Sequence, residues 1–326
     1  MQKRLAISFA VAALALGAGL PAGAADVSYL AIVKSQNYAQ APGGAPTILA
    51  SNGYAFAAVV VGATNNLVLG ATVKPPNPTP VRTLMSDTNG GLWQFIDATN
   101  SSTALDALYP GGFASYTLTL QTTNDGTKTV TLSFGFASAP PTPQIGNLPA
   151  AQDLDSTAAF TLQWAALGNS FTIVQLTVLD RASNTVFSTP APLQPGALSG
   201  ANTSVVIAAH SLPPGATLTG MLSAGNPGLP NTSYGTGLAA LARITTFPLV
   251  TRALAPPRLT VLAPTDNPFQ FRLNGETNVN YEILSATNLA SWTLWLTTNS
   301  PTGVVDLSAP RAPGTERRFY RARAVQ

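Results

Sequence analysis

The sequence predicts an all-β protein made of tandem β-sandwich modules joined by proline-rich linkers. Three observations carry this prediction. Short runs that alternate apolar and polar residues recur along the chain, and turn-forming residues separate them. Charged residues make up only 9% of the chain, which contains 27 glycines and 27 prolines. Long runs of Glu, Lys and Leu at helical spacing do not occur in the sequence.

The first 24 residues are predicted to be an export signal. Lys3 and Arg4 give it a basic start, residues 5–20 form an apolar run, and Ala22-Gly23-Ala24 is a small-x-small cleavage site. The run is too short for a membrane span and ends at the cleavage site. We therefore expect a secreted or cell-envelope protein that begins at Ala25 and has no transmembrane anchor in its mature form.

The composition of the mature chain excludes several functions. Its 302 residues fit two or three domains of roughly 100 residues each. Sixteen basic residues less Lys3 and Arg4 leave 14 against 13 acidic residues. This near-neutral balance lacks the clustered Lys and Arg that nucleic-acid binding requires. The chain has no cysteine, which excludes thiolate catalysis and cysteine metal sites.

The first predicted module covers residues 25–138. Residues 54–61 (YAFAAVVV) form a nearly continuous apolar run, which is typical of a strand covered on both faces. Four prolines place residues 74–82 in a loop. Residues 103–108 (TALDAL) can form one helical turn. Further strands are expected at 27–33, 66–73 and 92–96.

The clearest local signal in the chain is a β-hairpin in this module. Residues 115–122 (SYTLTLQT) and 128–136 (KTVTLSFGF) both alternate apolar and polar positions. Asn124-Asp125-Gly126 lies between them and supplies residues that tolerate a positive φ. The two runs are therefore expected to pair as antiparallel strands across this turn.

The second predicted module covers residues 143–248. It follows a linker at 137–148 (ASAPPTPQIGNL), whose prolines favour extended backbone. Phe160, Leu162 and Trp164 alternate, so Trp164 is expected to fill the core. Strands are expected at 158–164, 171–179, 203–208, 217–223 and 241–247.

The third predicted module covers residues 255–326 and follows the linker Ala255-Pro256-Pro257. Strands are expected at 258–262, 269–273, 279–285, 291–297, 304–307 and 317–325. In the last strand, one face should carry Tyr320, Ala322 and Ala324, and the other should carry Phe319, Arg321 and Arg323. Together with Arg317 and Arg318, these arginines are expected to form ion pairs and protect a sheet edge. An acidic partner is the alternative.

Two parts of the chain resemble modules of large secreted proteins of the Verrucomicrobia and related bacteria. The third module resembles their C-terminal β-sandwich module, and the second resembles their fibronectin-III-like module. The resemblance implies a β-sandwich fold and export, and it supplies no catalytic residue. The matching residues of the third module are Tyr281-Glu282-Ile283, Ser285, Leu289, Trp292 and Arg318-Phe319-Tyr320-Arg321. Those of the second are Phe160 to Trp164, Pro195 to Gly200, Ser204 to Ile207 and Leu212 to Gly215.

His210, the only histidine in the chain, is a weak candidate for catalysis. A Ser-His-Asp triad or a histidine zinc site would have to use it. No G-x-S-x-G motif accompanies it, and it lies in a predicted turn beside Pro213 and Pro214. We therefore expect an exposed loop residue, without a metal or other cofactor.

Pairs of carboxylates leave a hydrolytic alternative open. Asp97 and Asp106 flank a loop rich in Asn, Ser and Thr, and Asp153 and Asp155 share one face of an extended segment. Two carboxylates on either side of a sugar can cleave a glycosidic bond, and carboxylates also bind calcium. The turn at Asp125 lacks the ligand spacing of a calcium loop, and turn capping is the simpler role for Asp125 and Asp153.

The best candidate ligand-binding residue is Trp295. It follows Trp292 by three positions in one predicted strand, and an odd spacing places the two rings on opposite faces. If Trp292 packs in the core, Trp295 is displayed beside Asn and Thr residues. A displayed indole ring offers a sugar a flat apolar surface with polar neighbours. The alternative is that a loop or another module covers Trp295.

These observations favour a non-catalytic binding or adhesion protein that is secreted or attached to the cell envelope. Its expected partner is an extracellular polysaccharide or another envelope component. A carboxylate-dependent polysaccharide hydrolase and a structural surface or matrix component are the two alternatives.

Overall fold

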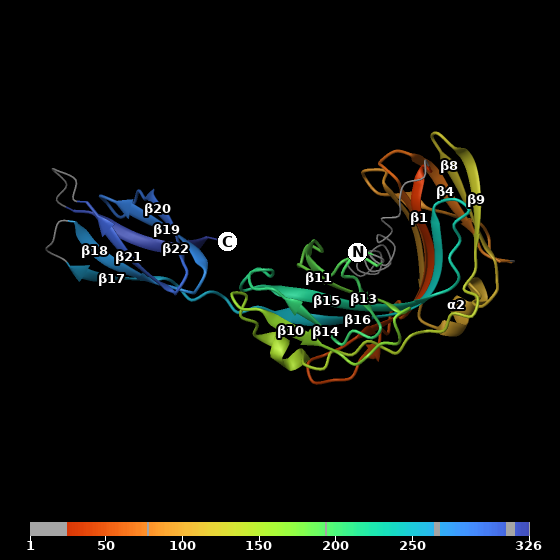
Figure 1. Ribbon diagram of the computed structural model, residues 1–326, viewed down its shortest axis with the longest axis horizontal. Helices are drawn as coiled ribbons and strands as arrows, with labels where there is room; N and C mark the ends of the chain where they lie inside the picture. The colour runs from red at the N-terminus through yellow and green to blue at the C-terminus, as the bar shows by residue number, and fades with distance from the viewer. Residues whose placement is uncertain (1–24, 77, 193, 264–267, 311–316, 326) are drawn as a thin grey trace. The chain divides into compact units, whose positions relative to one another are not determined.

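A computed structural model describes residues 25–76, 78–192, 194–263, 268–310 and 317–325. The predicted export signal therefore lies outside the described residues. The prediction of an all-β protein with sandwich-like sheets is confirmed: strands dominate, and the described chain has one α-helix and one short 3-10 helix (Figure 1). The chain forms two compact units. Unit 1 comprises the described residues of Met1–Gln152, Thr161–Val206 and Thr217–Leu249, and unit 2 comprises those of Asp153–Phe160, Ile207–Ala216 and Val250–Gln326.

The largest element of unit 1 is a ten-stranded sheet. Its strands run in the order β12-β11-β15-β16-β1-β3-β7-β6, with β13 paired to β11 and β2 paired to β1. The bounds of the strands are β1 Val27–Ala39, β2 Thr47–Ile48, β3 Tyr54–Gly62, β6 Met85–Ser86, β7 Leu92–Thr99, β11 Ile173–Leu179, β12 Thr185–Ser188, β13 Leu198–Ser199, β15 Thr217–Pro227 and β16 Thr236–Val250.

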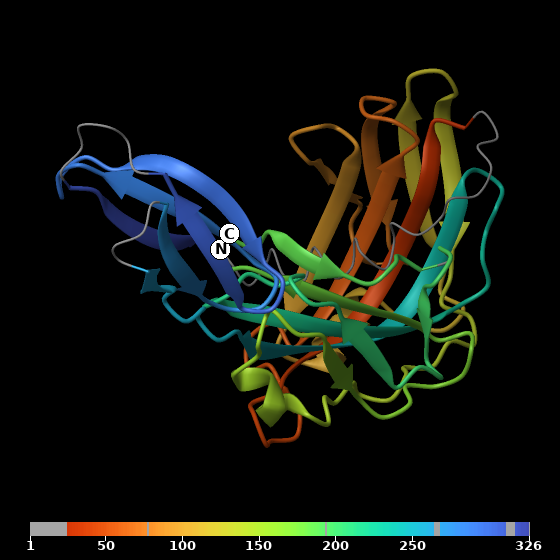
Figure 2. The ribbon, with the colours of Figure 1, turned by 60° about the vertical axis from the view of Figure 1, so that its left-hand side comes forward.

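The centre of this sheet is a parallel pair formed by β1 and β16 (Figure 2). Their register runs from Tyr29 opposite Thr236 to Ala39 opposite Thr246, while β3 pairs with the other edge of β1 in antiparallel fashion. The backbone hydrogen bonds along these two edges satisfy the N–H and C=O groups of β1, which is buried along most of its length. Strands about 200 residues apart in the sequence thus lie side by side.

The main core of unit 1 lies between this sheet and a second, four-stranded sheet. Leu30, Ile32 and Phe56 on the large sheet belong to the same fully buried cluster as Tyr116 and Leu118 on the small one. Sheets that pack face to face in this way form a sandwich. The small sheet has the order β5-β4-β8-β9, with bounds β4 Val68–Lys74, β5 Arg82–Thr83, β8 Tyr116–Thr122 and β9 Gly126–Leu132.

Strand β3 is buried on both faces, as its apolar run predicted. Phe56 and Ala58 point into the main core, while Ala55 and Ala57 belong to a second apolar cluster on the opposite face. The predicted hairpin is also present, because β8 and β9 pair with Thr122 opposite Gly126, whose φ is +70°. The second strand of the hairpin ends at Leu132, earlier than the alternating pattern predicted.

The single α-helix lies in the segment that was predicted to form a helical turn. Helix α2 spans Ser102–Leu108, and the Ser101 hydroxyl caps it by accepting a hydrogen bond from the Ala104 N–H at 3.4 Å. Leu105 is its buried residue and packs in the main core of unit 1. The helix thereby holds Ser102 and Asp106 beside strand β1.

Trp164 lies in the core of unit 1. This ring is only 4% exposed, as the sequence predicted, and its Nε1–H donates to the Asn202 carbonyl at 2.8 Å. A buried indole needs such a partner. The nearby elements are a 3-10 helix, Leu148–Gln152, and a two-stranded sheet formed by β10 Phe160–Gln163 and β14 Ser204–Ile207.

Residues 137–148, expected to be a free linker, are packed within unit 1. The Gln40 side chain accepts a hydrogen bond from the Ile145 N–H at 2.8 Å and donates to the Ile145 carbonyl at 2.9 Å. The Thr245 hydroxyl donates to the Pro143 carbonyl at 2.6 Å. Unit 1 thus contains strands from both the first and the second predicted modules, and its limits do not fall at residues 138–143.

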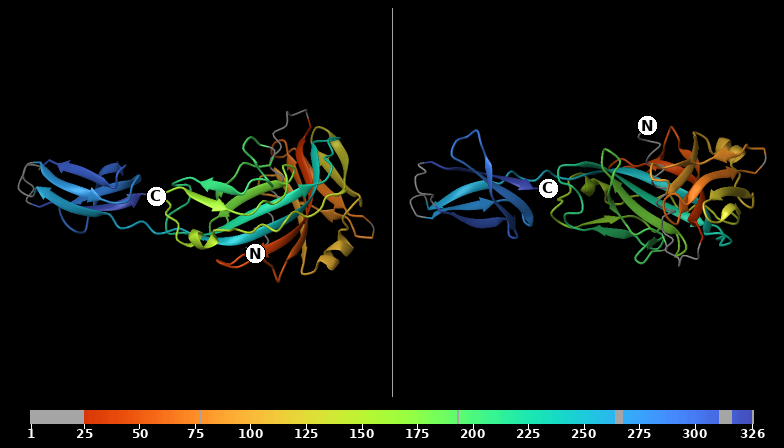
Figure 3. Two further views of the ribbon diagram at one scale, coloured as in Figure 1. Left: turned by 60° about the horizontal axis from the view of Figure 1, so that its bottom comes forward. Right: turned by 90° about the horizontal axis from the view of Figure 1, so that it is seen from above.

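Unit 2 contains a sandwich of two three-stranded sheets (Figure 3). Phe271, Leu273, Tyr281 and Ile283 form its buried core. Tyr320, Ala322 and Ala324 pack against this core, as the alternation of the last strand predicted. The sheets have the orders β17-β18-β21 and β20-β19-β22, with bounds β17 Arg258–Ala263, β18 Phe269–Asn274, β19 Val279–Ala286, β20 Thr293–Ser300, β21 Val304–Ala309 and β22 Phe319–Val325.

Gly237 tests how tightly the β1–β16 pair is packed. A Cβ at this position would lie 2.7 Å from Leu30 Cδ1 and 2.8 Å from Leu132 Cδ2, inside the main core. We expect Gly237→Ala to lower the free energy of unfolding of unit 1 by about 1–3 kcal/mol, since extra volume in a packed core forces side chains off their rotamers. Urea denaturation would measure the loss.

The matched control is Gly70→Ala in strand β4. The nearest atom to an added Cβ there is Gln121 Oε1 at 3.6 Å, which is ordinary van der Waals contact. We expect this variant to unfold at the urea concentration of the parent or above it. Equal stability of the two variants would show that the β1–β16 junction is loosely packed.

Candidate binding site

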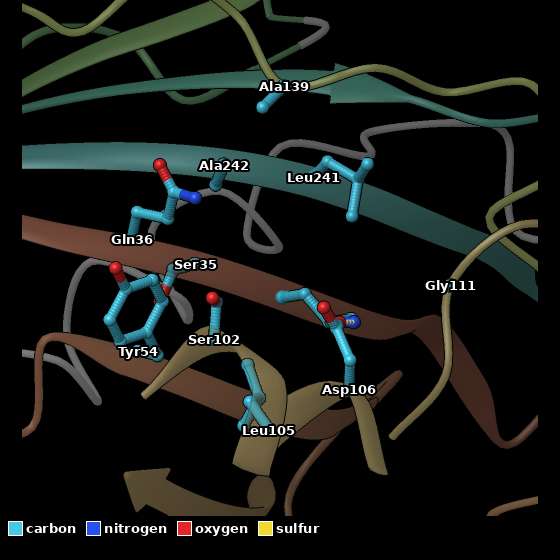
Figure 4. A pocket seen from close by; sticks show the side chains of 11 residues that line it. Ser35, Gln36, Tyr54, Ser102, Leu105, Asp106, Gly111, Ala139, Leu241 and Ala242 are labelled. Atoms are coloured by element: carbon cyan, nitrogen blue, oxygen red, sulfur yellow. Dashed lines mark hydrogen bonds and ion pairs between the residues drawn. The ribbon is translucent and has the colours of Figure 1, made fainter. Parts of the chain in front are cut away.

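Unit 1 contains a pocket of about 230 Å³ beside helix α2 and strand β1. Figure 4 shows Ser102 and Asp106 of α2 on one side of it and Ala139 and Leu241 on the other. Within the described residues, the hydroxyl groups of Tyr54 and Ser102 have no hydrogen-bond partner, so both are available to a ligand. The lining residues are Lys34, Ser35, Gln36, Tyr54, Ser102, Leu105, Asp106, Gly111, Ala139, Leu241 and Ala242.

An ion pair between Lys34 and Asp106 forms part of the pocket wall. Lys34 projects from the central strand β1, and its side chain is only 10% exposed, whereas that of Asp106 is 61% exposed. A lysine so deeply buried needs a carboxylate partner, because an unpaired ammonium group is costly to remove from water. Helix α2 supplies that carboxylate, so the helix and the sheet together build the pocket.

Asp97 lies outside this pocket and has partners of its own. The Tyr109 hydroxyl donates to Asp97 Oδ2 at 2.8 Å, and the Arg82 guanidinium lies 4.0 Å from the same oxygen. The Tyr109 ring stacks on Phe56 with centroids 4.1 Å apart. Burial, and then the hydrogen bond to Asp97, raise the pKa of the Tyr109 phenol to about 12.

Of the two candidate carboxylates for glycoside hydrolysis, Asp106 lines the pocket, whereas Asp97 accepts the hydrogen bond of the Tyr109 hydroxyl. Phe56 lies between Lys34 and Asp97 in the register of strands β1, β3 and β7, and it carries the stacked ring of Tyr109. Asp106 lines the pocket and Asp97 does not. The pocket lining therefore contains one carboxylate of this pair.

Two exposed phenylalanines lie within three positions, along the chain, of the pocket-lining residues Gly111 and Ala139. Phe113 is 62% exposed and Phe136 is 89% exposed, and their rings meet edge to face with centroids 4.5 Å apart. The two loops are joined by a hydrogen bond from the Gly135 N–H to the Gly112 carbonyl at 2.8 Å. Phe113 follows the lining residue Gly111 by two positions. Two exposed rings in contact form a small apolar patch that a ligand can cover.

The sequence analysis missed this aromatic pair for a local reason. Residues 128–136 alternate like a strand, which places Phe134 and Phe136 on one face. In the structure the strand has ended at Leu132, and Gly135 adopts a φ of +56°. This turn leaves Phe134 fully buried while Phe136 faces solvent. Gly135, which lies between the two phenylalanines, was the residue in the sequence that could have indicated a turn there.

Trp295, the predicted ligand-binding residue, is half-buried and belongs to the core side of the unit 2 sandwich. Its ring lies 5.9 Å from that of Phe271 and 5.5 Å from that of Tyr320. Trp292 instead lies outside the core cluster, with the Arg321 guanidinium 4.4 Å from its ring centre. Both tryptophans are half-buried, and it is Trp295, not Trp292, that packs against the core.

A β-bulge explains the reversal. Ile283 pairs with Leu296 and Leu284 pairs with Leu294, so Trp295 is an extra residue in strand β20. A bulge places two consecutive side chains opposite one residue of the partner strand and re-aims them. Trp295 therefore packs toward Phe271, which strict alternation along β20 does not predict.

The other candidate residues have structural partners. His210 is exposed, with a φ of +62°, and its backbone N–H donates to the Ser156 carbonyl at 2.6 Å. Asp155 pairs with Arg252 at 2.8 Å and accepts two hydrogen bonds from Thr157, and those bonds lower the pKa of Asp155. Asp153 is exposed. Among the described residues, no three His, Asp or Glu side chains gather into a group that could hold a metal ion.

The turn at Asp125 does more than cap itself. Its carboxylate accepts hydrogen bonds from the Asp26 N–H at 3.0 Å and from the Tyr234 hydroxyl at 2.7 Å. The hairpin tip thereby ties the beginning of β1 to the segment before β16.

The described part of the chain has no helix long and apolar enough to cross a membrane.

Comparison with known proteins gives no family. No protein-family model matches the chain, and neither does any curated protein. The FN1-FN3 domains of chicken CNTN1 are similar at 14% identity, over 87% of this chain and 91% of that chain, with a TM-score of 0.20. A tetra-tandem repeat from the extending region of a large adhesion protein is similar at 12% identity, over 90% and 73%, with a TM-score of 0.24. A domain tandem from titin is similar at 9% identity, over 90% and 94%, with a TM-score of 0.30. Scores this low carry no conclusion about this chain.

The Lys34–Asp106 pair gives a test of the pocket wall. Asp106→Ala leaves a buried ammonium group without its partner, so we expect a loss of about 1–2 kcal/mol, less than for a fully buried pair because Asp106 is exposed. The double variant Lys34→Met/Asp106→Ala should recover most of this stability, because methionine buries no charge. Urea denaturation of the parent, both single variants and the double variant gives the coupling energy. A stable Asp106→Ala protein would mean that Lys34 is solvated and that the pair does not build the wall.

Proposed function

We propose that this chain is an exported, non-catalytic binding protein that attaches to neutral polysaccharide through the pocket of unit 1. The observation that carries the proposal is the exposed Phe113–Phe136 pair, on loops that run into the lining residues Gly111 and Ala139, together with the hydroxyl groups of Tyr54 and Ser102 in a largely apolar pocket. A sugar presents apolar C–H faces and a rim of hydroxyl groups, and it therefore needs both kinds of surface from a protein.

The size and lining of the pocket suit one sugar unit of a longer chain. Its volume of about 230 Å³ lies below the roughly 300–1,000 Å³ of pockets that enclose drug-sized ligands. Tyr54 and Ser102 offer unpartnered hydroxyl groups, and the exposed carboxylate of Asp106 offers further acceptors. Neighbouring sugar units can then rest on Phe113 and Phe136 outside the pocket.

Binding without turnover is supported by the state of the carboxylates. Asp106 is paired with Lys34, and Asp97 is bonded to Tyr109 outside the pocket. A hydrolase would need a second carboxylate facing Asp106 across the sugar. Export is supported by the pattern of the first 24 residues. The mature chain would then lie at the cell surface or in the extracellular space, where polysaccharide is available to it.

The test is a binding assay on the chain that begins at Ala25. It would be sedimented with insoluble cellulose and xylan, and the supernatant would be assayed for new reducing ends. We expect binding without release of sugar. The double variant Phe113→Ala/Phe136→Ala should bind at least about tenfold more weakly, because the exposed rings are the anchoring residues.

Phe171→Ala is the matched control for this assay. Phe171 is 79% exposed and lies in the same unit, but its ring is not part of the Phe113–Phe136 pair. We expect it to bind like the parent. The Trp295→Ala variant tests the prediction from the sequence that Trp295 binds a sugar, and it should also bind like the parent. New reducing ends would favour the hydrolase, and absence of binding to every polysaccharide would favour a structural surface component.

A further inference from the structure

The outer face of the sheet β20-β19-β22 in unit 2 carries a second group of side chains with binding chemistry. The register places Leu284 between Arg321 and Leu294, and the next row along places Glu282 between Arg323 and Thr297. Residues opposite one another in neighbouring strands share a face. Polar and basic side chains therefore follow one another along this side of the sheet.

Arg321 is held in place on this face by an aromatic ring. Its guanidinium lies 4.4 Å from the centre of the Trp292 ring, and the Trp292 Nε1–H donates to the Leu289 carbonyl at 3.1 Å, which fixes the indole. The neighbouring Leu284 is only 6% exposed. A guanidinium stacked on an indole keeps its N–H groups, which lie in the plane, free for an anion. Within the described residues Arg321 has no carboxylate partner.

The charge on this face is positive. Arg321 and Arg323 of β22 are exposed on this face, and Arg317 and Arg318, which precede the strand, are exposed as well. The described carboxylate among them is Glu282, which accepts a hydrogen bond from Arg323 Nε at 2.6 Å. The prediction that these arginines form ion pairs is thus fulfilled by Arg323, while Arg321 stacks on Trp292. An excess of exposed arginines attracts anions.

We propose that this face binds an anionic polysaccharide whose sugars carry carboxylate groups. The fork of an arginine binds the two oxygens of a carboxylate, and unit 2 already shows this geometry where Arg272 Nε and Nη2 bond Asp306 at 2.7 and 2.9 Å. Arg321 is the primary carboxylate-binding residue, and Trp292 is the residue that positions it.

The rest of the face favours a sugar polymer over an acidic polypeptide. Asn299 Nδ2 donates to Asn280 Oδ1 at 2.8 Å, and both amides are exposed on the row that follows Glu282 and Thr297. Amides and hydroxyl groups are the partners that sugar hydroxyl groups need. Leu294, which is 57% exposed, adds one apolar surface for a C–H face. This inference does not depend on the proposed function, because the two sites belong to different units and bind chemically different polymers.

The test compares one polymer with and without its charge. The chain from Ala25 onward would be titrated with polygalacturonate and with fully methyl-esterified polygalacturonate at 0.15 M salt. We expect binding to the acid form, at least about tenfold weaker binding to the ester, and a decline as salt screens the charges. Arg321→Ala should weaken binding about tenfold, and Trp292→Ala should weaken it as well.

Two further variants keep the result interpretable. Arg258→Ala removes the same charge from an exposed residue of β17, in the other sheet of unit 2, and should weaken binding less than about twofold. Arg321→Lys retains the charge and an aliphatic stem but lacks the fork, so it should fold like the parent and bind between the parent and Arg321→Ala. Circular dichroism checks that each variant is folded.

Several outcomes would overturn the inference. Equal binding of the acid and the ester would show that charge does not matter. Equal losses in Arg258→Ala and Arg321→Ala would show diffuse attraction rather than a site. Equally tight binding of poly-glutamate would assign the face to acidic polypeptides. Absence of binding to polygalacturonate would also overturn it, and neutral polysaccharide binding by unit 1 would be measured separately with the Phe113→Ala/Phe136→Ala variant.

Discussion

The parallel pairing of β1 with β16 is the constraint on which unit 1 depends. Ile32 and Ala239 lie opposite each other in this pair and both point into the main core, while Val33 and Ala240 lie opposite each other and point to the second cluster. Strands from the two ends of the unit thus contribute neighbouring residues to both apolar clusters. Parallel strands need a long connection, and here that connection carries the remaining strands of the unit.

The same pairing positions the pocket. Lys34 of β1 lies opposite Leu241 of β16, and both residues line the pocket. Helix α2 can pair Asp106 with Lys34 because β1 is fixed in the middle of the sheet. The aromatic pair depends on local backbone conformation, since a glycine with a positive φ immediately before Phe113 and before Phe136 directs each ring outward. The proposed site therefore combines a rigid strand with two loops that a hydrogen bond joins.

Local elements were predictable from the sequence, and long-range pairing was not. Alternation and apolar runs predicted the longer strands, the Asn124-Asp125-Gly126 turn predicted the hairpin, and period two placed Trp164 in the core. The β1–β16 register depends on residues about 200 positions apart, for which a single sequence carries no signal. The bulge at Trp295 and the turn at Gly135 each break period two at one residue, so alternation alone does not place Trp295 or Phe136.

The most direct test of this account is whether residues 25–142 fold alone. That fragment contains the first predicted module but lacks β16, so one edge of β1 and part of both apolar clusters would be open. The account predicts poor chemical-shift dispersion in its amide NMR spectrum and rapid proteolysis, whereas residues 25–255, which retain β16, should give a dispersed spectrum and unfold cooperatively. A dispersed spectrum and cooperative unfolding of residues 25–142 would contradict it, because the first module would then be independent of the β1–β16 pair.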